Sequence, residues 1–194
     1  MFFSRKPKGP TKKYIAYKSE MAKYRNVMTA FKNQGDRRLV TYFFEQTGKE
    51  VRQLCEVLEL TISEPGSSSG ADITLINAYD LGKKHPLLDS SEIVCIEVHP
   101  LSRVNALVEE AFQHKASGQI TYYIGMDEPL FEVFGAERIL RLMEQMGMEE
   151  NEPITHPMIS KSLERGMEKL QKTLANPQDI RTSSEEWRAA NMPS

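Results

Sequence analysis

Four side chains with catalytic or ligand-binding potential stand at two places in the middle of the sequence. Glu97 and His99 are two residues apart at the end of an apolar segment, and Lys83 and Lys84 are adjacent in a polar loop. Alternate residues of a strand share a face, so Glu97 and His99 are expected together at the carboxyl end of a strand, where α/β sheets place ligands. A metal site needs three or four ligands, and no third ligand is identifiable. The favoured interpretation is a polar strand end followed by Pro100.

Lys83 and Lys84 are the weak candidates for a cofactor site, because an ammonium group can contact a phosphate. Exposed lysines are common, so a solvated surface loop is the favoured interpretation. The sequence contains no Gly-x-x-x-x-Gly-Lys-Ser/Thr motif, the loop that holds nucleotide phosphates. Neither the serines at 67–69 nor His156 before Pro157 has the partners that a nucleophile or a base requires. We therefore predict no cofactor, no metal site and no catalytic residue.

Strand-like and helix-like segments alternate through the first two thirds of the sequence. Short apolar segments rich in β-branched and aromatic residues predict strands at 39–44, 73–76, 93–98 and 120–124. Apolar residues at helical spacing predict helices at 18–33, from Thr47 onward and at 101–115. The alternation predicts an α/β fold with a mostly parallel sheet of about five strands and helices on both faces. Its crossovers are expected to be right-handed.

Two further amphipathic helices are predicted after the last strand. The first has an apolar side made of Ile139, Leu140, Leu142, Met143 and Met146, with Gly147 as its C-cap. The second begins near Thr155 and buries Ile159, Leu163, Met167, Leu170 and Leu174. We expect Leu163 and Met167 to pack against Leu142 and Met146 or against the sheet.

The order of residues in this helical region carries a resemblance to a known family. The matching residues are Phe134-Gly135, Glu137-Arg138-Ile139, Leu142-Met143, Gly147-Met148, Glu152-Pro153-Ile154, His156-Pro157, Ser160-Lys161, Glu164 and Asp179-Ile180-Arg181. In this order and spacing they resemble the end of the second nucleotide-binding lobe of SecA, the bacterial protein-export motor. The resemblance extends from Lys12 to about Arg181, and it is strong only after Gln119. It implies a degenerate, stand-alone RecA-like lobe.

The resemblance also shows which ATPase residues this sequence lacks. Where SecA has an arginine-rich segment before the aromatic strand, residues 106–118 contain no arginine and include Glu109 and Glu110. The glycine-rich loop of the family corresponds at best to residues 78–85. Arginines of this kind stabilise the charge that develops during phosphoryl transfer. The sequence therefore predicts that the chain is not an enzyme.

Composition limits the class of protein. The 194 residues are 40% hydrophobic with a formal net charge of −2, which gives no footprint for nucleic-acid binding. Cys55 and Cys95 stand in apolar segments without ligand spacing, as reduced core thiols of a cytosolic protein do. We expect a basic flexible tail at 1–13, a degenerate lobe at 14–134, helices packed on it at 135–175 and a polar tail with a short helix at 176–194.

The basic tail has two interpretations. It combines two aromatic residues with a group of cations, namely Phe2, Phe3, Arg5, Lys6 and Lys8. One interpretation is a solvated, disordered tail. The other is a weak peripheral contact with an anionic membrane at the inner face of the cell. The expected location is cytoplasmic in both cases.

These predictions favour a binding or assembly module over an enzyme. By resemblance, the partner is a protein of a secretion or targeting machinery. Candidate partner-binding residues are Lys161 and Glu164, on the predicted outer face of the last long helix, and Trp187 in the polar tail. The helix around Trp187 is expected to dock either onto a partner or back onto the lobe. The alternatives are a subunit that completes a partner's ATP site and a helicase-like nucleic-acid-binding lobe.

Overall fold

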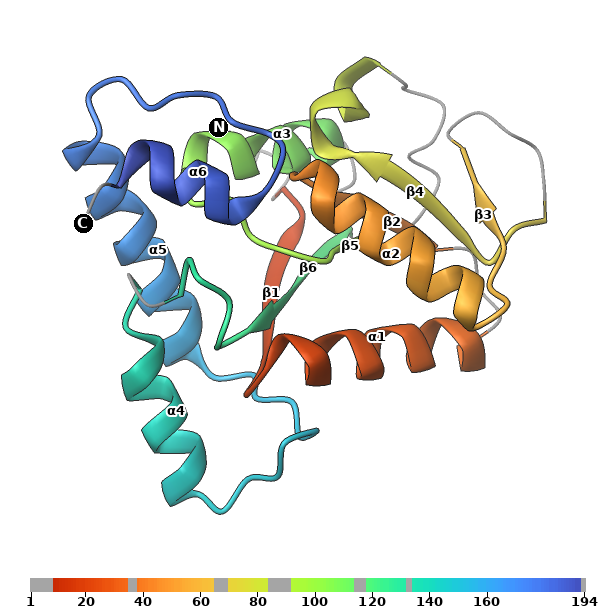
Figure 1. Ribbon diagram of the computed structural model, residues 1–194, viewed down its shortest axis with the longest axis horizontal. Coiled ribbons are helices and arrows are strands. Elements are labelled where there is room, and N and C mark those ends of the chain that lie inside the picture. The colour runs from red at the N-terminus through yellow and green to blue at the C-terminus, as the bar shows by residue number, and fades with distance from the viewer. Residues whose placement is uncertain are drawn as a thin grey trace, which may run out of the picture.

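A six-stranded, fully parallel sheet forms the centre of the structure, a computed structural model that describes residues 9–34, 38–64, 70–83, 92–113, 118–131 and 134–192 (Figure 1). The described strands lie in the order β1-β6-β5-β2-β4-β3. Their bounds are β1 Thr11–Tyr17, β2 Arg38–Tyr42, β3 Ile62–Ser63, β4 Ile73–Asn77, β5 Glu92–Cys95 and β6 Gln119–Gly125. The predicted α/β class and parallel sheet are confirmed, with six strands in place of about five.

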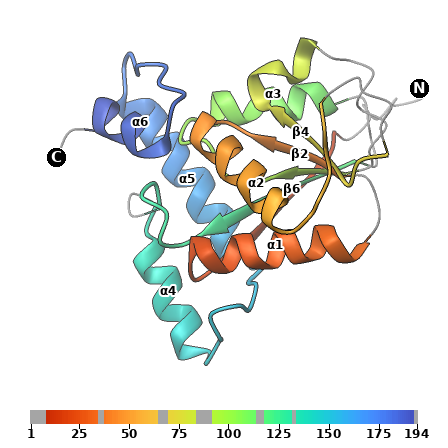
Figure 2. The ribbon, with the colours of Figure 1, turned by 45° about the vertical axis from the view of Figure 1, so that its right-hand side comes forward.

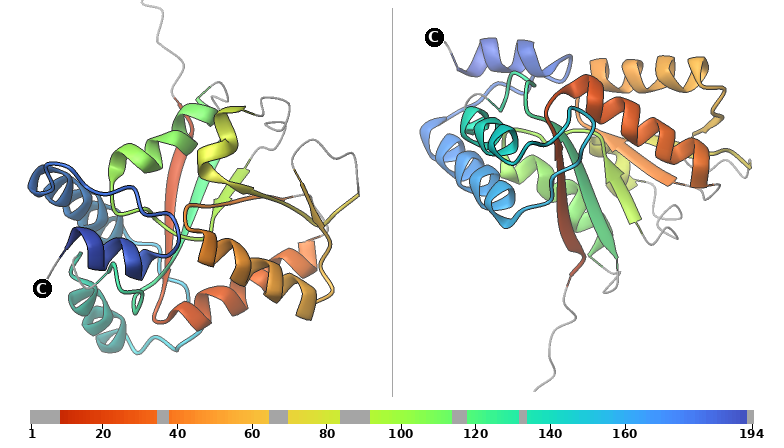
Figure 3. Two further views of the ribbon diagram at one scale, coloured as in Figure 1. Left: turned by 45° about the horizontal axis from the view of Figure 1, so that its top comes forward. Right: turned by 90° about the horizontal axis from the view of Figure 1, so that it is seen from below.

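Helices cover both faces of the sheet (Figure 2 and Figure 3). Their bounds are α1 Glu20–Gln34, α2 Glu45–Val57, the 3₁₀ helix η1 Ala78–Lys83, α3 Ser102–Phe112, α4 Ala136–Gln145, α5 Pro157–Thr173 and α6 Ser184–Asn191. Neighbouring residues of a strand point to opposite faces, so Val40 packs in the cluster under α1 and α2. Leu39 belongs to the cluster that also holds apolar side chains of α3, α4, α5 and α6. The sheet therefore separates two apolar cores.

Strand β1 was not predicted as a strand, and it corrects the boundary of the expected tail. It pairs with β6 from Thr11 onward, so residues 11–13 belong to the sheet. Lys12 and Lys13 are exposed at this edge, and their charges conceal the strand pattern in the sequence. The tail residues proposed for membrane contact, from Phe2 to Lys8, lie outside the described residues. The two-residue strand β3 was also missed, because it is too short to show a period.

The predicted C-terminal helical pair is confirmed in α4 and α5. Gly147 follows α4 in the left-handed conformation with φ of 68°, which a glycine adopts without steric cost. On α5, Leu163 and Met167 are buried as predicted. Met146 is 61% exposed, so its expected place in the packing is wrong. It comes after the last residue of α4, beyond the apolar stripe that Ile139 begins.

No described helix combines the length and the apolar composition that crossing a membrane requires.

Candidate functional site

The crevice at the carboxyl ends of β2 and β5 is the place where this fold would hold a ligand. After β2 the chain forms β3 and β4, which lie on one side of β2 in the strand order. It then forms β5, which lies on the other side of β2. The strand order thus changes direction between β2 and β5, and ligands of open α/β sheets bind at such switch points. The segment after β5 carries Glu97 and His99, and the N-terminus of α2 follows β2.

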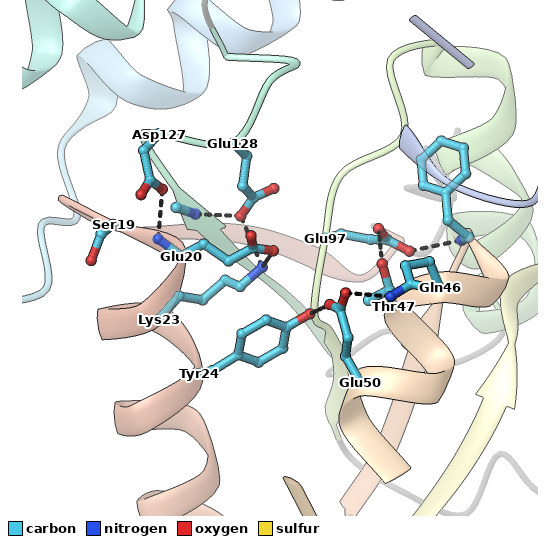
Figure 4. A network of polar contacts seen from close by, with 12 residues as sticks. Ser19, Glu20, Lys23, Tyr24, Gln46, Thr47, Glu50, Glu97, Asp127 and Glu128 are labelled. Carbon is cyan, nitrogen blue, oxygen red and sulfur yellow. Dashed lines mark hydrogen bonds and ion pairs between the residues drawn. The ribbon is translucent and has the colours of Figure 1, made fainter. Parts of the chain in front are cut away.

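The carboxylate of Glu97 lies at the N-terminus of α2 and accepts hydrogen bonds there (Figure 4). Its Oε1 accepts hydrogen bonds from the backbone N–H of Phe43 at 2.6 Å and of Phe44 at 2.9 Å. Its Oε2 accepts one from the Thr47 hydroxyl at 2.7 Å. Burial raises the pKa of Glu97, and these three hydrogen bonds act against that shift. Free N–H groups at a helix N-terminus bind anions, and here a side chain of the protein fills the position.

His99 is held in the same crevice as a buried, neutral ring. Its Nδ1 accepts a hydrogen bond from the Leu101 N–H at 3.1 Å. The imidazole stacks on Phe44 with ring centroids 5.4 Å apart and meets the edge of Trp187 at 5.6 Å. Burial lowers the pKa of His99 to about 3. The ring therefore stays uncharged at neutral pH, and its contacts are those of a core residue.

The segment from Gln178 to Asn191 closes the crevice from outside. The N–H groups of Glu45 and Gln46, in the first turn of α2, donate to the carbonyl oxygens of Arg181 at 2.8 Å and Thr182 at 2.9 Å. Trp187 of α6 is only 1% exposed. As a partner-binding candidate Trp187 is thus corrected: its indole is packed in the lobe's own core, the second of the two outcomes expected for this helix.

The side chain of Asn191 joins the end of this closing segment to its beginning at Gln178. Its side chain accepts from the Gln178 N–H at 2.6 Å and donates to the Gln178 carbonyl at 3.1 Å. The Arg181 guanidinium lies 3.8 Å from the centroid of the Tyr79 ring and pairs with Asp179 at 2.5 Å. Arg181 is the last of the residues that resemble the SecA sequence, and in this structure its guanidinium is paired with Asp179.

A second carboxylate, Glu128, is buried near the start of α1. It accepts from the Gly125 N–H at 2.6 Å and from the Lys23 ammonium at 2.8 Å. Burial raises the pKa of Glu128 to about 7, although Lys23 lowers it. Desolvation lowers the pKa of Lys23, but Glu128 and Glu20 outweigh it and raise the value. The neighbouring Asp127 accepts from the Glu20 N–H at 2.6 Å, so α1 also begins at a carboxylate of this chain (Figure 4).

The polar groups of the crevice are therefore used in hydrogen bonds within the chain. A residual cavity of about 260 Å³ remains beside His99, Asp179 and Trp187. No cluster of His, Cys, Asp or Glu within the described ranges is suited to a metal ion. Glu109 lies away from the crevice, because it pairs with Lys12 of β1 at 3.1 Å.

The other predicted residues are spread over the surface. Lys161 and Glu164 are exposed on α5, as expected. His156 caps α5, since its Nδ1 accepts from the Met158 N–H at 3.1 Å. The Lys83 side chain, Lys84 and the serines at 67–69 lie outside the described residues. The structure thus does not bring the predicted positions together into one site.

Sequence reasoning missed Thr47, Lys23 and Glu128 as polar members of buried networks. The sequence predicts a helix that starts at Thr47, whereas α2 begins at Glu45 and the Thr47 hydroxyl donates to Glu97. Lys23 and Glu128 are 105 residues apart in the sequence, so no local pattern connects them.

Comparisons with known proteins find sequence similarity to SecA. The chain is 29% identical to the protein translocase subunit SecA of Syntrophus aciditrophicus over 128 residues, 66% of this chain and 14% of that protein. It is 34% identical to SecA of Christiangramia forsetii over 113 residues, 58% and 10% of the two chains. With SecA of Clostridium botulinum strain Eklund 17B it shares 29% over 140 residues, 72% and 16%. The chain resembles the C-terminal nucleotide-binding lobe of SecA.

The similarity to SecA covers only part of this chain and a small part of each relative. The chain spans 10–16% of the length of these three relatives. No protein-family model matches it. Among solved structures, the C-terminal part of the Fun30 ATPase domain matches with a TM-score of 0.45 and 9% identity, over 79% of this chain and 54% of that one.

Proposed function

We propose that the chain is a non-catalytic SecA-like module that acts as a binding or assembly subunit in protein translocation. The SecA relatives are protein translocase subunits, which supports the translocation context. The observation that carries the non-catalytic part is Glu97, whose carboxylate takes three donors at the N-terminus of α2. A nucleotide phosphate at that position would have to displace Glu97 and overcome its charge.

The closing segment supports the same proposal. Two further N–H donors of α2, those of Glu45 and Gln46, are already used by the backbone of residues 181–182. A nucleotide would have to release this segment and expose Trp187 before it reached the helix. That release is unfavourable because it would expose the buried indole to water and break its contact with His99.

The first test is nucleotide binding and turnover by the purified full chain. We expect no saturable binding of fluorescently labelled ATP and no phosphate release. Turnover that survives purification and disappears in the Lys83→Ala/Lys84→Ala double variant would overturn the non-catalytic assignment. ATP binding that appears only when a partner is added would instead favour a subunit that completes the partner's ATP site.

The second test addresses the partner. The full chain is added to SecA-driven protein translocation into membrane vesicles, and its binding to the translocase is measured by sedimentation. We expect binding that the Lys161→Glu/Glu164→Lys double variant abolishes. The matched control is Glu144→Lys, an exposed glutamate of α4. Failure of the wild-type chain to bind would remove the translocase from the proposal.

A further inference from the structure

An acidic cavity lies at the edge of the sheet, away from the crevice. Strand β1 forms this edge, and α5 packs beside it (Figure 1). The cavity measures about 310 Å³, and its walls include Tyr14 of β1, Glu109 of α3, and Glu164 and Glu168 of α5. This volume is at the small end of ligand sites and suits a single long side chain.

The Tyr14 hydroxyl marks this cavity as an incomplete site. Tyr14 is only 8% exposed, and its ring stacks on Tyr122 with centroids 5.2 Å apart. Its hydroxyl forms no hydrogen bond with another described residue and is not one of the fully enclosed unpaired atoms, so it is open to the cavity and free to bond a ligand. Burial raises the pKa of Tyr14, and the carboxylates of Glu164 and Glu109 raise it further. The hydroxyl therefore faces a cavity in which negative charge dominates.

The charge of the cavity is not balanced. Among the described residues, three carboxylates line it against the single ammonium of Lys12, which binds Glu109 at 3.1 Å. Within the described part of the chain, Glu164 and Glu168 form no ion pair. They are four residues apart on α5, so they project from the same side of the helix. An ammonium or guanidinium group entering the cavity would find two unpaired carboxylates and an unpaired hydroxyl.

The backbone of β1 offers a second set of contacts at the same place. Thr11 donates its N–H to Gly118 beside β6, and Ala16 exchanges both backbone hydrogen bonds with Ile154 on the opposite side. Residues of even number in β1 thus direct their backbone groups away from β6. Ile154 pairs with Ala16, whereas the outward backbone groups of Lys12 and Tyr14 have no hydrogen-bond partner among the described residues. Such an edge can pair with an extended segment of another chain.

We propose that this edge binds an extended segment of a partner protein, with a lysine or arginine side chain of that segment in the acidic cavity. Pairing with the backbone of Lys12 and Tyr14 orients the segment along β1. The basic side chain then meets Glu164 and Glu168 and supplies the donor that the Tyr14 hydroxyl lacks. This inference rests on the proposed binding function, and it specifies the surface and the chemistry of the partner.

The test uses short capped peptides and the full chain. The first peptide is an extended Thr/Val sequence with one central arginine, and the second carries neutral citrulline at that position. A third keeps the arginine but has N-methylated backbone amides. Agmatine serves as a free guanidinium. Binding is measured by NMR titration of the isotope-labelled chain. We expect the citrulline and N-methylated peptides to bind at least about tenfold more weakly than the arginine peptide.

Variants locate the binding site. The Glu164→Gln/Glu168→Gln double variant should bind the arginine peptide with about tenfold lower affinity. The Glu144→Gln variant, changed on α4, should bind it with unchanged affinity. Lys12→Gln should strengthen binding about threefold, because it frees Glu109 and removes a competing cation. A purely structural role of these exposed residues would produce neither change.

The outcomes separate this inference from the proposed function. Equal affinity of the arginine and citrulline peptides, or no binding at millimolar concentration, overturns the inference. Agmatine binding as tightly as the peptide restricts the site to small cations and overturns the strand pairing. Peptide binding that persists in a chain that hydrolyses ATP leaves this site standing while the non-catalytic function fails.

Discussion

The crevice between β2 and β5 and the acidic cavity at β1 use polar groups in opposite ways. In the crevice, the Glu97 carboxylate receives three short hydrogen bonds, and the closing segment takes two further donors. At β1, the Tyr14 hydroxyl lacks a partner, and two carboxylates of α5 lack cations among the described residues. The donors of the crevice are satisfied from within the chain, whereas the sheet edge has polar groups without partners among the described residues. This difference supports the proposal of a protein partner.

Removing the indole that closes the crevice should have the largest effect. Trp187→Ala is expected to lower the free energy of unfolding by about 3–5 kcal/mol, because it leaves a cavity beside His99 in the core. Denaturation in urea measures it. Glu185→Gln, an exposed change in the same helix, should stay within about 0.5 kcal/mol. If the two variants were equally stable, α6 would not be a fixed part of the lobe.

The buried Glu128 gives a dependence on pH. Its folded pKa of about 7 lies above the ordinary value of 4.5, so the folded chain retains a proton that the unfolded chain releases. Its contribution to stability is therefore full below pH 4.5 and is lost as pH rises through 7. Relative to Glu128→Gln, the wild-type chain should lose at most about 3 kcal/mol over this range. Parallel pH profiles for the two proteins would contradict the raised pKa.

A smaller effect is expected for one hydrogen bond of the crevice. Thr47→Val keeps the shape of the side chain but removes the donor to Glu97 Oε2, at a cost of about 2 kcal/mol, as for a hydrogen bond to a charged group. The control is Thr29→Val on the exposed side of α1, with a change below about 0.5 kcal/mol. Equal denaturation midpoints for the two variants would show that Glu97 does not need this donor.

The smallest effect should come from the acidic cavity. Tyr14→Phe removes a hydroxyl without a hydrogen-bond partner, so the free energy of unfolding should change by less than about 0.5 kcal/mol. The contrast with Thr47→Val is the sharpest comparison between the two regions. A loss of 1–2 kcal/mol would reveal a partner within the chain and would remove the reason to place a ligand there.

The sequence was sufficient to predict the alternation of strands and helices, and insufficient where burial depends on distant segments. The inner strands β2 and β5 overlap the mostly apolar segments 39–44 and 93–98, whereas β1 carries Lys12 and Lys13 because it is an edge. The pair Glu97 and His99 was correctly placed at a strand end. Its hydrogen bonds to Thr47 and Leu101 could not be read from spacing alone.

The burial of Trp187 shows the same limit. Its helix is polar in sequence, and the indole packs against His99, more than 80 residues earlier. The acidic cavity likewise combines residues from β1, α3 and α5. A single sequence shows each of these elements but not which of their faces meet.

The pairing of β1 with β6 also has a consequence for the order of events during protein synthesis. Thr11 bonds to Gly118, 107 residues later, so β1 leaves the ribosome long before its partner strand exists. Contacts of such long sequence separation slow folding. Until β6 emerges, both edges of β1 lack their native partners, and Tyr14 and Tyr17 stay in water. The nascent chain thus passes through a period in which it is prone to aggregation, and faster synthesis of residues 18–125 would shorten it.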